Sequence, residues 1–287
     1  MFDALLNFGW GGLILLLWIG LAVGSFLNVV IYRLPVMLNR QWDTQAREQL
    51  AMDTENAAPQ EAFNLLVPRS RCPSCGHAIT ARENIPLVSW FLLKRKCAGC
   101  NATIAMRYPI VELLTGIITL VVIATFGFTW FGVAALGYSY TLIALTYIDF
   151  DTQLLPDQMT LPLVWAGLAV NLYGGGMTDI QSAIVGAIAA YLFLWSTYWA
   201  FKLLTGKEGM GYGDFKLYAA IGAWLGWQVL PAVILIAAIA GLVFALVSIF
   251  TKSLARDQPI PFGPFLAVAG WIALMWRSDL LTLFLVA

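Results

Sequence analysis

At the entrance to an apolar segment the chain reads Gly206-Lys207-Glu208-Gly209-Met210-Gly211-Tyr212-Gly213-Asp214-Phe215-Lys216-Leu217. Its alternating glycines allow backbone conformations with positive φ and the close approach of another chain, such as an extended peptide. An ionised aspartate at a membrane boundary is costly unless it faces a polar cavity or a partner, so Asp214 is a candidate functional residue. Short glycine-rich strings are weak signals, however, and on spacing alone a flexible loop between two helices explains this stretch equally well.

A second acidic stretch follows the apolar segment 130–148 and reads Asp149-Phe150-Asp151-Thr152-Gln153-Leu154-Leu155-Pro156-Asp157. Asp149 therefore also stands at a membrane boundary. Asp157 adjoins the next apolar run and is predicted to be its helix N-cap. Asp151 is open to two interpretations, a solvated loop position or a member of the functional site.

The composition is that of a membrane protein. Of 287 residues, 60% are hydrophobic and only 11% are charged, and the mean hydropathy is +0.79. Apolar runs of spanning length recur, which predicts an all-α polytopic membrane protein. The first run is too long for a signal peptide and lacks a preceding basic segment, so residues 1–32 are predicted to be a retained transmembrane helix. The composition gives no indication of nucleic-acid binding.

The distribution of basic residues predicts the topology. Ten of the sixteen lie between residues 33 and 107, and five follow at Lys202, Lys207, Lys216, Lys252 and Arg256. In an arrangement of about eight transmembrane helices these fifteen share one side, and only Arg277 lies on the other. Because loops rich in Lys and Arg stay in the cytoplasm, the amino terminus is predicted outside, with Asp149 and Asp214 together on the cytoplasmic face.

Two of the eight predicted spans are short. Segments 159–173 and 215–227 have 15 and 13 residues, against the roughly 20 that a helix needs to cross a bilayer. Either their helices begin in the preceding loops, or the bilayer is thinned around them.

The four cysteines form two Cys-x₂-Cys pairs, 21 residues apart, at Cys72, Cys75, Cys97 and Cys100. Four thiolates in such pairs can bind one structural Zn²⁺ in a tetrahedron. Two redox pairs or disulfides are the alternatives, but a cytoplasmic location disfavours lasting disulfides and no βαβ context supports redox catalysis. His77, the single histidine, is predicted to lie beside the site or on the surface. Residues 33–107 are thus predicted to be a cytoplasmic, zinc-ribbon-like insertion.

Two facing carboxylates can hydrolyse a peptide bond without a metal or a covalent nucleophile. They cannot both ionise cheaply, so they share a proton: one activates water as a base, and the other polarises the amide carbonyl as an acid. The chain offers no competing arrangement, since its histidine and cysteines lie in the predicted zinc segment and no Gly-x-Ser-x-Gly string occurs. Asp149 and Asp214 are therefore the candidate catalytic pair.

Further motifs occur in order along the chain: Gly24-Ser25-Phe26-Leu27-Asn28-Val29-Val30 with Arg33-Leu34-Pro35, the four cysteines, Glu83-Asn84-Ile85-Pro86, Arg107-Tyr108-Pro109-Ile110-Val111-Glu112 and Pro259-Ile260-Pro261-Phe262-Gly263-Pro264. Together with the two acidic stretches they resemble the type IV prepilin peptidases, which belong to the GxGD intramembrane aspartyl proteases. The resemblance covers essentially the whole chain and is poor only over residues 40–60.

The resemblance implies a bifunctional enzyme of the bacterial inner membrane. Such enzymes cut the short basic leader of prepilins and pseudopilins after a glycine, then methylate the new amino terminus with S-adenosylmethionine. Matched residue by residue, it implies catalytic roles for Asp149 and Asp214, with Gly211 and Gly213 completing the second motif, in a seven-helix protease domain over residues 108–287. The cysteine segment belongs to the bifunctional members, so methylation is expected, although no glycine-rich cofactor motif marks the methyl-donor site.

Two other functional classes explain parts of the sequence. A proton-coupled transporter also uses intramembrane acids, but it carries them within its spans and in repeated halves. A non-catalytic membrane scaffold with a zinc ribbon does not explain the motif Gly211-Tyr212-Gly213-Asp214. Glu112 is either functional or paired at the interface with Arg107 or Lys96, and the pairing is the favoured interpretation.

Overall fold

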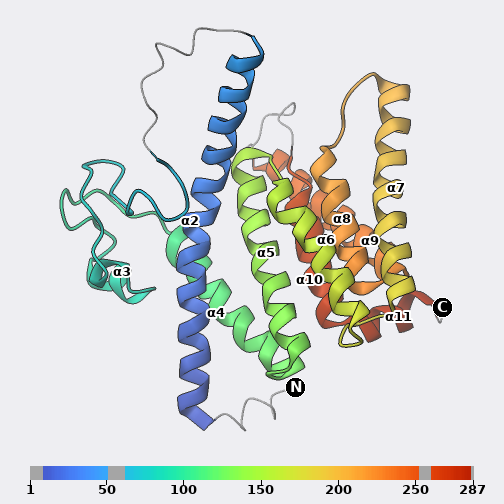
Figure 1. Cartoon of the computed structure of the whole chain (residues 1–287), viewed down its shortest axis with the longest axis horizontal. Helices are drawn as coiled ribbons and strands as arrows, with labels where there is room; N and C mark the ends of the chain where they lie inside the picture. The colour runs from blue at the N-terminus through green and yellow to red at the C-terminus, as the bar shows by residue number, and fades with distance from the viewer. Residues whose placement is uncertain (1–8, 51–61, 252–259, 286–287) are drawn as a thin grey trace. The chain divides into compact units, whose positions relative to one another are not determined.

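The structure, a computed structural model, describes residues 9–50, 62–251 and 260–285. Within these ranges the ordered elements are helices, apart from two isolated antiparallel bridges, Arg71 with Ala78 and Lys96 with Thr103. The chain divides into two compact units, Met1–Ala124 and Thr125–Ala287 (Figure 1). The predicted all-α class is confirmed.

The first unit is built on two apolar helices, α2 (Gly9–Gln49) and α4 (Arg107–Phe126). Gly20 and Gly24 stand one turn apart on α2, and a methyl group at either position would overlap atoms of α4, such as Cα of Glu112 at Gly24. This small-xxx-small spacing lets two helix backbones approach closely in lipid, where packing drives helix association. The small residues of α2 therefore let its backbone pack closely against α4.

The first helix continues beyond residue 32, where the sequence analysis placed the end of the membrane span, through Pro35 to Gln49. The side chain of Arg33 is buried and donates hydrogen bonds to the carbonyl oxygens of Asn64 (2.8 Å) and Pro68 (2.6 Å). Backbone acceptors thus replace water around the guanidinium, so this charged side chain can be buried within a continuous helix.

The segment that supplies these carbonyls packs along α2. The guanidinium carbons of Arg33 and Arg40 lie 5.5 and 4.4 Å from the ring centroid of Phe63, within the range of cation–π attraction. Of residues 40–60, where the resemblance is poor, those as far as Gln49 belong to α2, and residues 51–60 lie outside the described residues.

Five described helices are long and apolar enough to cross a membrane: α2, α4, α5 (Trp130–Thr152), α7 (Ile180–Thr205) and the segment Trp227–Phe250, which joins η2 (Trp227–Val229) to α9 (Leu230–Phe250). The helices α10 (Gly263–Met275) and α11 (Arg277–Leu285) pass this test only as a pair bent by 96°, which gives six candidates at most. A multi-pass membrane architecture is confirmed at this level, but the eight predicted spans are not shown.

Two short helices explain the difference. The helices α6 (Asp157–Leu172) and α8 (Tyr212–Leu225) have 16 and 14 residues, or about 24 and 21 Å at 1.5 Å per residue, against a hydrocarbon core of about 30 Å. They begin only slightly before the predicted spans 159–173 and 215–227, so starting in the loops does not make up the missing length.

The short helix α8 is the core of the second unit. From Asp214 to Leu225 every residue except Lys216 is buried, and α6, α7 and α10 pack around it. The Asn171 side chain on α6 donates hydrogen bonds to the carbonyl oxygens of Ala223 (2.8 Å) and Trp224 (3.1 Å). The end of α8 is therefore satisfied by protein groups, which is what allows a short helix to lie inside a membrane unit.

Candidate functional site

Asp149 lies in the last turn of α5. Its side chain is buried, with 5% of the residue exposed, and Oδ2 has no hydrogen-bond partner. The helix ends through Gln153, which adopts the left-handed conformation and donates its backbone N–H to the carbonyl oxygen of Asp149 (2.9 Å). The cap holds the backbone of Asp149 in place while one carboxyl oxygen stays available.

Asp214 lies in the first turn of α8. Gly211 is the N-cap, and its carbonyl oxygen accepts the backbone N–H of Asp214 (3.2 Å). Only 7% of Asp214 is exposed, and Oδ1 has no hydrogen-bond partner. The two acids interact electrostatically, so the structure brings together the two carboxyls that the sequence singled out.

Glycines allow the close packing around these acids. A methyl group at Gly263, the first residue of α10, would stand 2.5 Å from Oδ2 of Asp149 and 3.1 Å from Cδ1 of Leu155. A methyl group at Gly213 would stand 2.7 Å from Cβ of Leu155. The Leu155 side chain therefore packs against the first turns of both α8 and α10, at positions where a glycine leaves room for it.

The sequence analysis assigned no role to Leu155 or Gly263, although both stand in motifs that it quoted. Gly263 precedes Pro264 at the start of an apolar helix, and proline in the first turn is a helix-start signal. That signal locates the helix terminus but not its neighbour, because nothing local in the sequence places α10 beside Asp149.

The remaining acids of the two stretches lie elsewhere. Asp151 is exposed. Asp157 is not the predicted N-cap of α6, since Pro156 occupies that position and no side-chain cap is formed. Instead Oδ1 of Asp157 forms an ion pair with Nζ of Lys216 (2.6 Å), which links the start of α6 to α8 at the surface.

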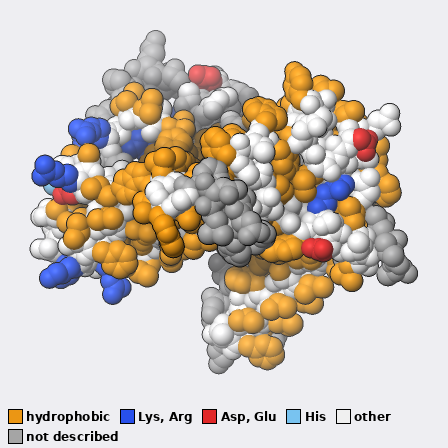
Figure 2. All heavy atoms as spheres, turned by 90° about the horizontal axis from the view of Figure 1, so that it is seen from below, with side chains coloured by type: hydrophobic (Ala, Val, Ile, Leu, Met, Phe, Trp, Pro, Cys, Tyr) orange, Lys and Arg blue, Asp and Glu red, His pale blue; other side chains and the backbone are white. Residues whose placement is uncertain are grey.

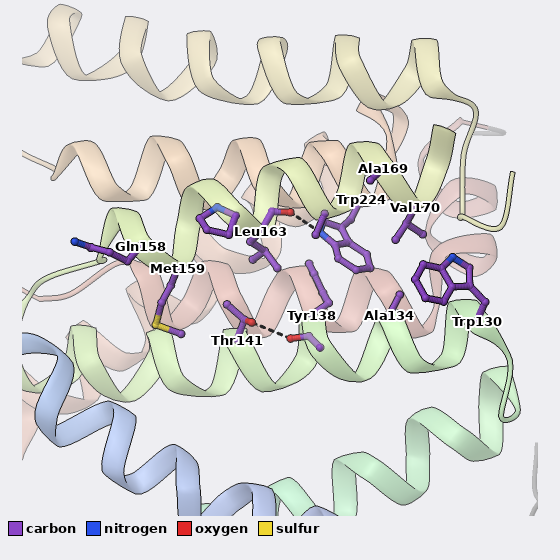
Figure 3. Close-up of a pocket in the computed structure, with 13 residues that line it drawn as sticks. Trp130, Ala134, Tyr138, Thr141, Gln158, Met159, Leu163, Ala169, Val170 and Trp224 are labelled. Carbon is purple, nitrogen blue, oxygen red and sulfur yellow. Dashed lines mark hydrogen bonds between the residues drawn. The ribbon is translucent and has the colours of Figure 1, made fainter. Parts of the chain in front are cut away.

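A groove of about 510 Å³ runs between α5 and α6 (Figure 3). Apolar side chains from both helices line it together with Trp224, whose Nε1–H donates to the carbonyl oxygen of Leu163 (2.8 Å). Neither Asp149 nor Asp214 is among the lining residues, and no acidic or basic side chain is. The groove is therefore a packing feature of this unit and contains no carboxylate, imidazole, amine or guanidinium group for chemistry.

The four cysteine thiols of the first unit form one cluster. Their Sγ atoms all lie within 4.8 Å of one another, with 3.9 Å between Cys72 and Cys100 and between Cys75 and Cys97. Zinc bonds to thiolate of about 2.3 Å in a tetrahedron require sulfurs about 3.8 Å apart. The donor set and its spacing therefore fit Zn²⁺.

Both cysteine pairs share one backbone pattern. The backbone carbonyl oxygen of Cys72 accepts a hydrogen bond from the N–H of Gly76, and that of Cys97 accepts one from the N–H of Asn101, each at 2.9 Å. Gly76 and Asn101 both take positive φ, +72° and +58°, which glycine and asparagine tolerate best. The backbone N–H groups of Ser74 and Cys75 lower the pKa of the Cys72 thiol to about 6, which favours the thiolate form that binds metal.

His77 lies beside this cluster without joining it. Its Nε2 is 3.2 Å from a carboxylate oxygen of Glu83. The backbone N–H and hydroxyl of Thr80 also bind Glu83, and these bonds hold the pKa of that carboxyl below its usual range. The position beside the site agrees with the prediction for His77.

Glu112, for which the sequence favoured a pairing at the interface, is buried. Its Oε2 accepts the backbone N–H of Leu87 (2.8 Å), and its carboxyl group also accepts a hydrogen bond from the Ser25 side chain. These neutral donors reach Glu112 because the loop before α3 (Val88–Leu92) folds back against α4.

Comparisons with known proteins identify the family. The family model for the bacterial Peptidase A24 N-terminal domain matches residues 18–126, and that for the type IV leader peptidase family matches residues 136–246. A "Prepilin leader peptidase/N-methyltransferase" of Aeromonas salmonicida is 56% identical over 260 residues, which are 91% of this chain and 89% of that protein.

Proteins of the same description from Stutzerimonas stutzeri and Pseudomonas aeruginosa are 52% and 50% identical over 262 residues. Each alignment covers 91% of this chain, with 90% and 89% of the respective relative. No solved structure matches the chain significantly. At these identities and coverages, the chain belongs to the type IV leader peptidase family.

Proposed function

We propose that this chain is a prepilin leader peptidase and N-methyltransferase that cleaves with the pair Asp149 and Asp214. The observation that carries the proposal is the proximity of two buried carboxyls that interact electrostatically although their helices, α5 and α8, are far apart in the sequence. The relatives described as prepilin leader peptidase/N-methyltransferase support the substrate class and both activities.

The proposed cleavage divides the work between the two acids. They share one proton, so the ionised carboxyl accepts a proton from a water molecule while the protonated one donates to the carbonyl oxygen of the scissile amide. Water attack gives a tetrahedral intermediate, which collapses as the amide nitrogen is protonated and leaves. Gly213 serves this pair by letting Leu155 pack closely against the first turn of α8, and Gly211 is the N-cap of that helix.

Methyl transfer is the second proposed step. S-adenosylmethionine would supply the methyl group to the amine that cleavage exposes. Cleavage must come first, because the acceptor amine does not exist in the intact prepilin. We assign no residue to the donor site.

The proposed role of zinc is structural, because four thiolates close the coordination shell and leave no position for substrate. Changing Cys72→Ser together with Cys97→Ser is expected to release one zinc per chain and to speed hydrogen exchange across residues 63–107, since few other contacts order this segment. His77→Ala is the matched control and should keep its metal. Elemental analysis that finds no zinc in the folded wild-type chain would refute this role.

The proposed orientation follows the basic residues, with the amino terminus outside and the cysteine segment, Asp149 and Asp214 at the cytoplasmic face of the inner membrane. Eight crossings remain part of this proposal, with α6 and α8 as short spans in thinned lipid. Lys252 and Arg256, which entered the count, lie outside the described residues.

Reporter fusions test the orientation. A reporter after Phe128 or Tyr173 is expected outside, and one after Arg71 or Lys207 inside, because the basic residues hold their loops in the cytoplasm. Reporters after Asp149 and Gly213 should agree with each other. If these two land on opposite sides, the catalytic pair is impossible.

The proposed function as a whole is tested with the purified chain and a short prepilin that carries a Gly-Phe junction. We expect cleavage after the glycine, and N-methylation of the new terminus when S-adenosylmethionine is added. Failure of the folded, zinc-loaded protein to cut any prepilin would overturn it.

A further inference from the structure

The short helix α3 in the cysteine segment carries large apolar side chains on its surface. Phe91 is 67% exposed, Leu92 is 75% exposed and Val88 is 45% exposed. Figure 2 shows hydrophobic side chains among the Lys and Arg side chains that gather on this segment, at the left of the view. Neighbouring exposed apolar side chains with a charged border are typical of interaction sites.

The start of α3 is fixed at the end of two candidate membrane spans. The N–H of Leu87, directly before α3, donates to Oε2 of Glu112 (2.8 Å), only two turns into α4. At the same level, Nδ2 of Asn28 on α2 donates to the carbonyl oxygen of Tyr108 (3.2 Å). Because α2 and α4 are candidate spans, these contacts fix α3 beside the first turns of α4, at one end of a candidate membrane-spanning helix.

Three exposed cations, Lys94, Arg95 and Lys96, follow Leu93, the C-cap of α3. Their backbone N–H groups bond back to the carbonyl oxygens of Phe91, Trp90 and Leu93, so the turn folds against the helix. Lys94 and Arg95 take positive φ, +50° and +63°, where non-glycine residues are uncommon. This tight turn places a compact positive charge beside the apolar side chains.

The net charge of the whole segment is positive, even after the two negative charges that Zn²⁺ with four thiolates would carry. Residues 62–107 contain seven Lys and Arg and a single acid, Glu83, which is already bound by Thr80 and His77. Such a surface attracts anionic headgroups. A basic prepilin leader would be repelled by it, so the substrate leader is a poor candidate for its partner.

We propose that α3 and the turn Lys94-Arg95-Lys96 form an interfacial anchor for anionic phospholipid. Phe91 and Leu92 insert at the boundary between headgroups and acyl chains, and the three cations contact the phosphates. This combination of an apolar face with flanking basic residues is that of interfacial membrane helices. The anchor holds the cysteine cluster against the bilayer that contains α2 and α4, and it does not depend on the catalytic assignment.

Photo-crosslinking of the full chain in lipid nanodiscs tests the anchor. A benzophenone amino acid replaces Phe91 in one protein and Ala98, an exposed residue of the second cysteine pair, in the matched control. In discs with anionic lipid we expect at least about fivefold more phospholipid adduct at position 91 than at 98. Equal labelling at both positions, or adducts at 91 only with an added prepilin or a second copy, would overturn the proposal.

The cations are tested with two variants of equal charge change. Lys94→Gln/Arg95→Gln/Lys96→Gln should remove the preference for anionic over zwitterionic lipid at position 91, while Arg69→Gln/Arg71→Gln/Arg82→Gln should retain it. Unchanged zinc content shows that each variant is folded. If both triple variants lose the preference equally, the attraction belongs to the whole segment and the anchor assignment is wrong.

Discussion

Asp149→Asn and Asp214→Asn are each expected to lower prepilin cleavage at least about a thousandfold, because an amide can neither take a proton from water nor hold the shared one. Since the two acids act as a unit, the double variant should be no worse than either single one. The measurement is single-turnover cleavage of a prepilin peptide by purified protein.

Asp151→Asn is the matched control, and the exposed position of Asp151 leads us to expect substantial activity. Methyl transfer to an already trimmed pilin should survive in both inactive variants, which separates loss of chemistry from loss of fold. If Asp149→Asn cuts and Asp151→Asn does not, the pair is misassigned. Normal cleavage by all three variants would end the aspartyl interpretation.

Gly263→Ala is expected to lower kcat for cleavage by more than about a hundredfold, because misplacing a catalytic group by an ångström has this effect. The added methyl would stand 2.5 Å from Oδ2 of Asp149, so the carboxyl or the start of α10 must move. KM should change little, since Gly263 would act on Asp149 rather than on substrate.

Gly241→Ala is the control for this prediction. It adds the same methyl to α9, where the nearest atom, Cδ2 of Phe265, stands 3.4 Å away, an ordinary contact. Methyl transfer to a trimmed pilin should continue in both variants. If Gly263→Ala keeps the wild-type kcat, α10 does not position the catalytic pair, although the pair itself could still be right.

The class of the fold and the choice of candidate residues could be predicted because their signals are local. Apolar runs specify helices wherever they lie, and paired cysteines at zinc spacing carry their ligand geometry in the sequence. Asp149 and Asp214 could be identified as candidates because an ionised acid at a membrane boundary is energetically costly unless it has a functional or structural partner. The clustering of the four thiols agrees with the predicted metal site.

The features that the sequence could not predict arise where distant segments meet. Arg33 can be buried because the carbonyls that accept its hydrogen bonds come from Asn64 and Pro68, more than thirty residues away. Glu112 likewise accepts a backbone N–H from Leu87, in the loop before α3. The number of spans was predicted from apolar length, yet α8 is apolar because it is buried in protein, and hydropathy does not separate the two environments.

The central claim, that this chain cuts prepilins with a carboxyl pair and then methylates the product, meets its most direct test in mass spectrometry of one reaction. Purified wild-type protein, a short prepilin with a Gly-Phe junction and S-adenosylmethionine are incubated beside the Asp214→Asn variant. The account predicts a leader ending in glycine and an N-methylated phenylalanine terminus from the wild type, and intact prepilin from the variant. Cleavage at the same junction by Asp214→Asn would contradict it.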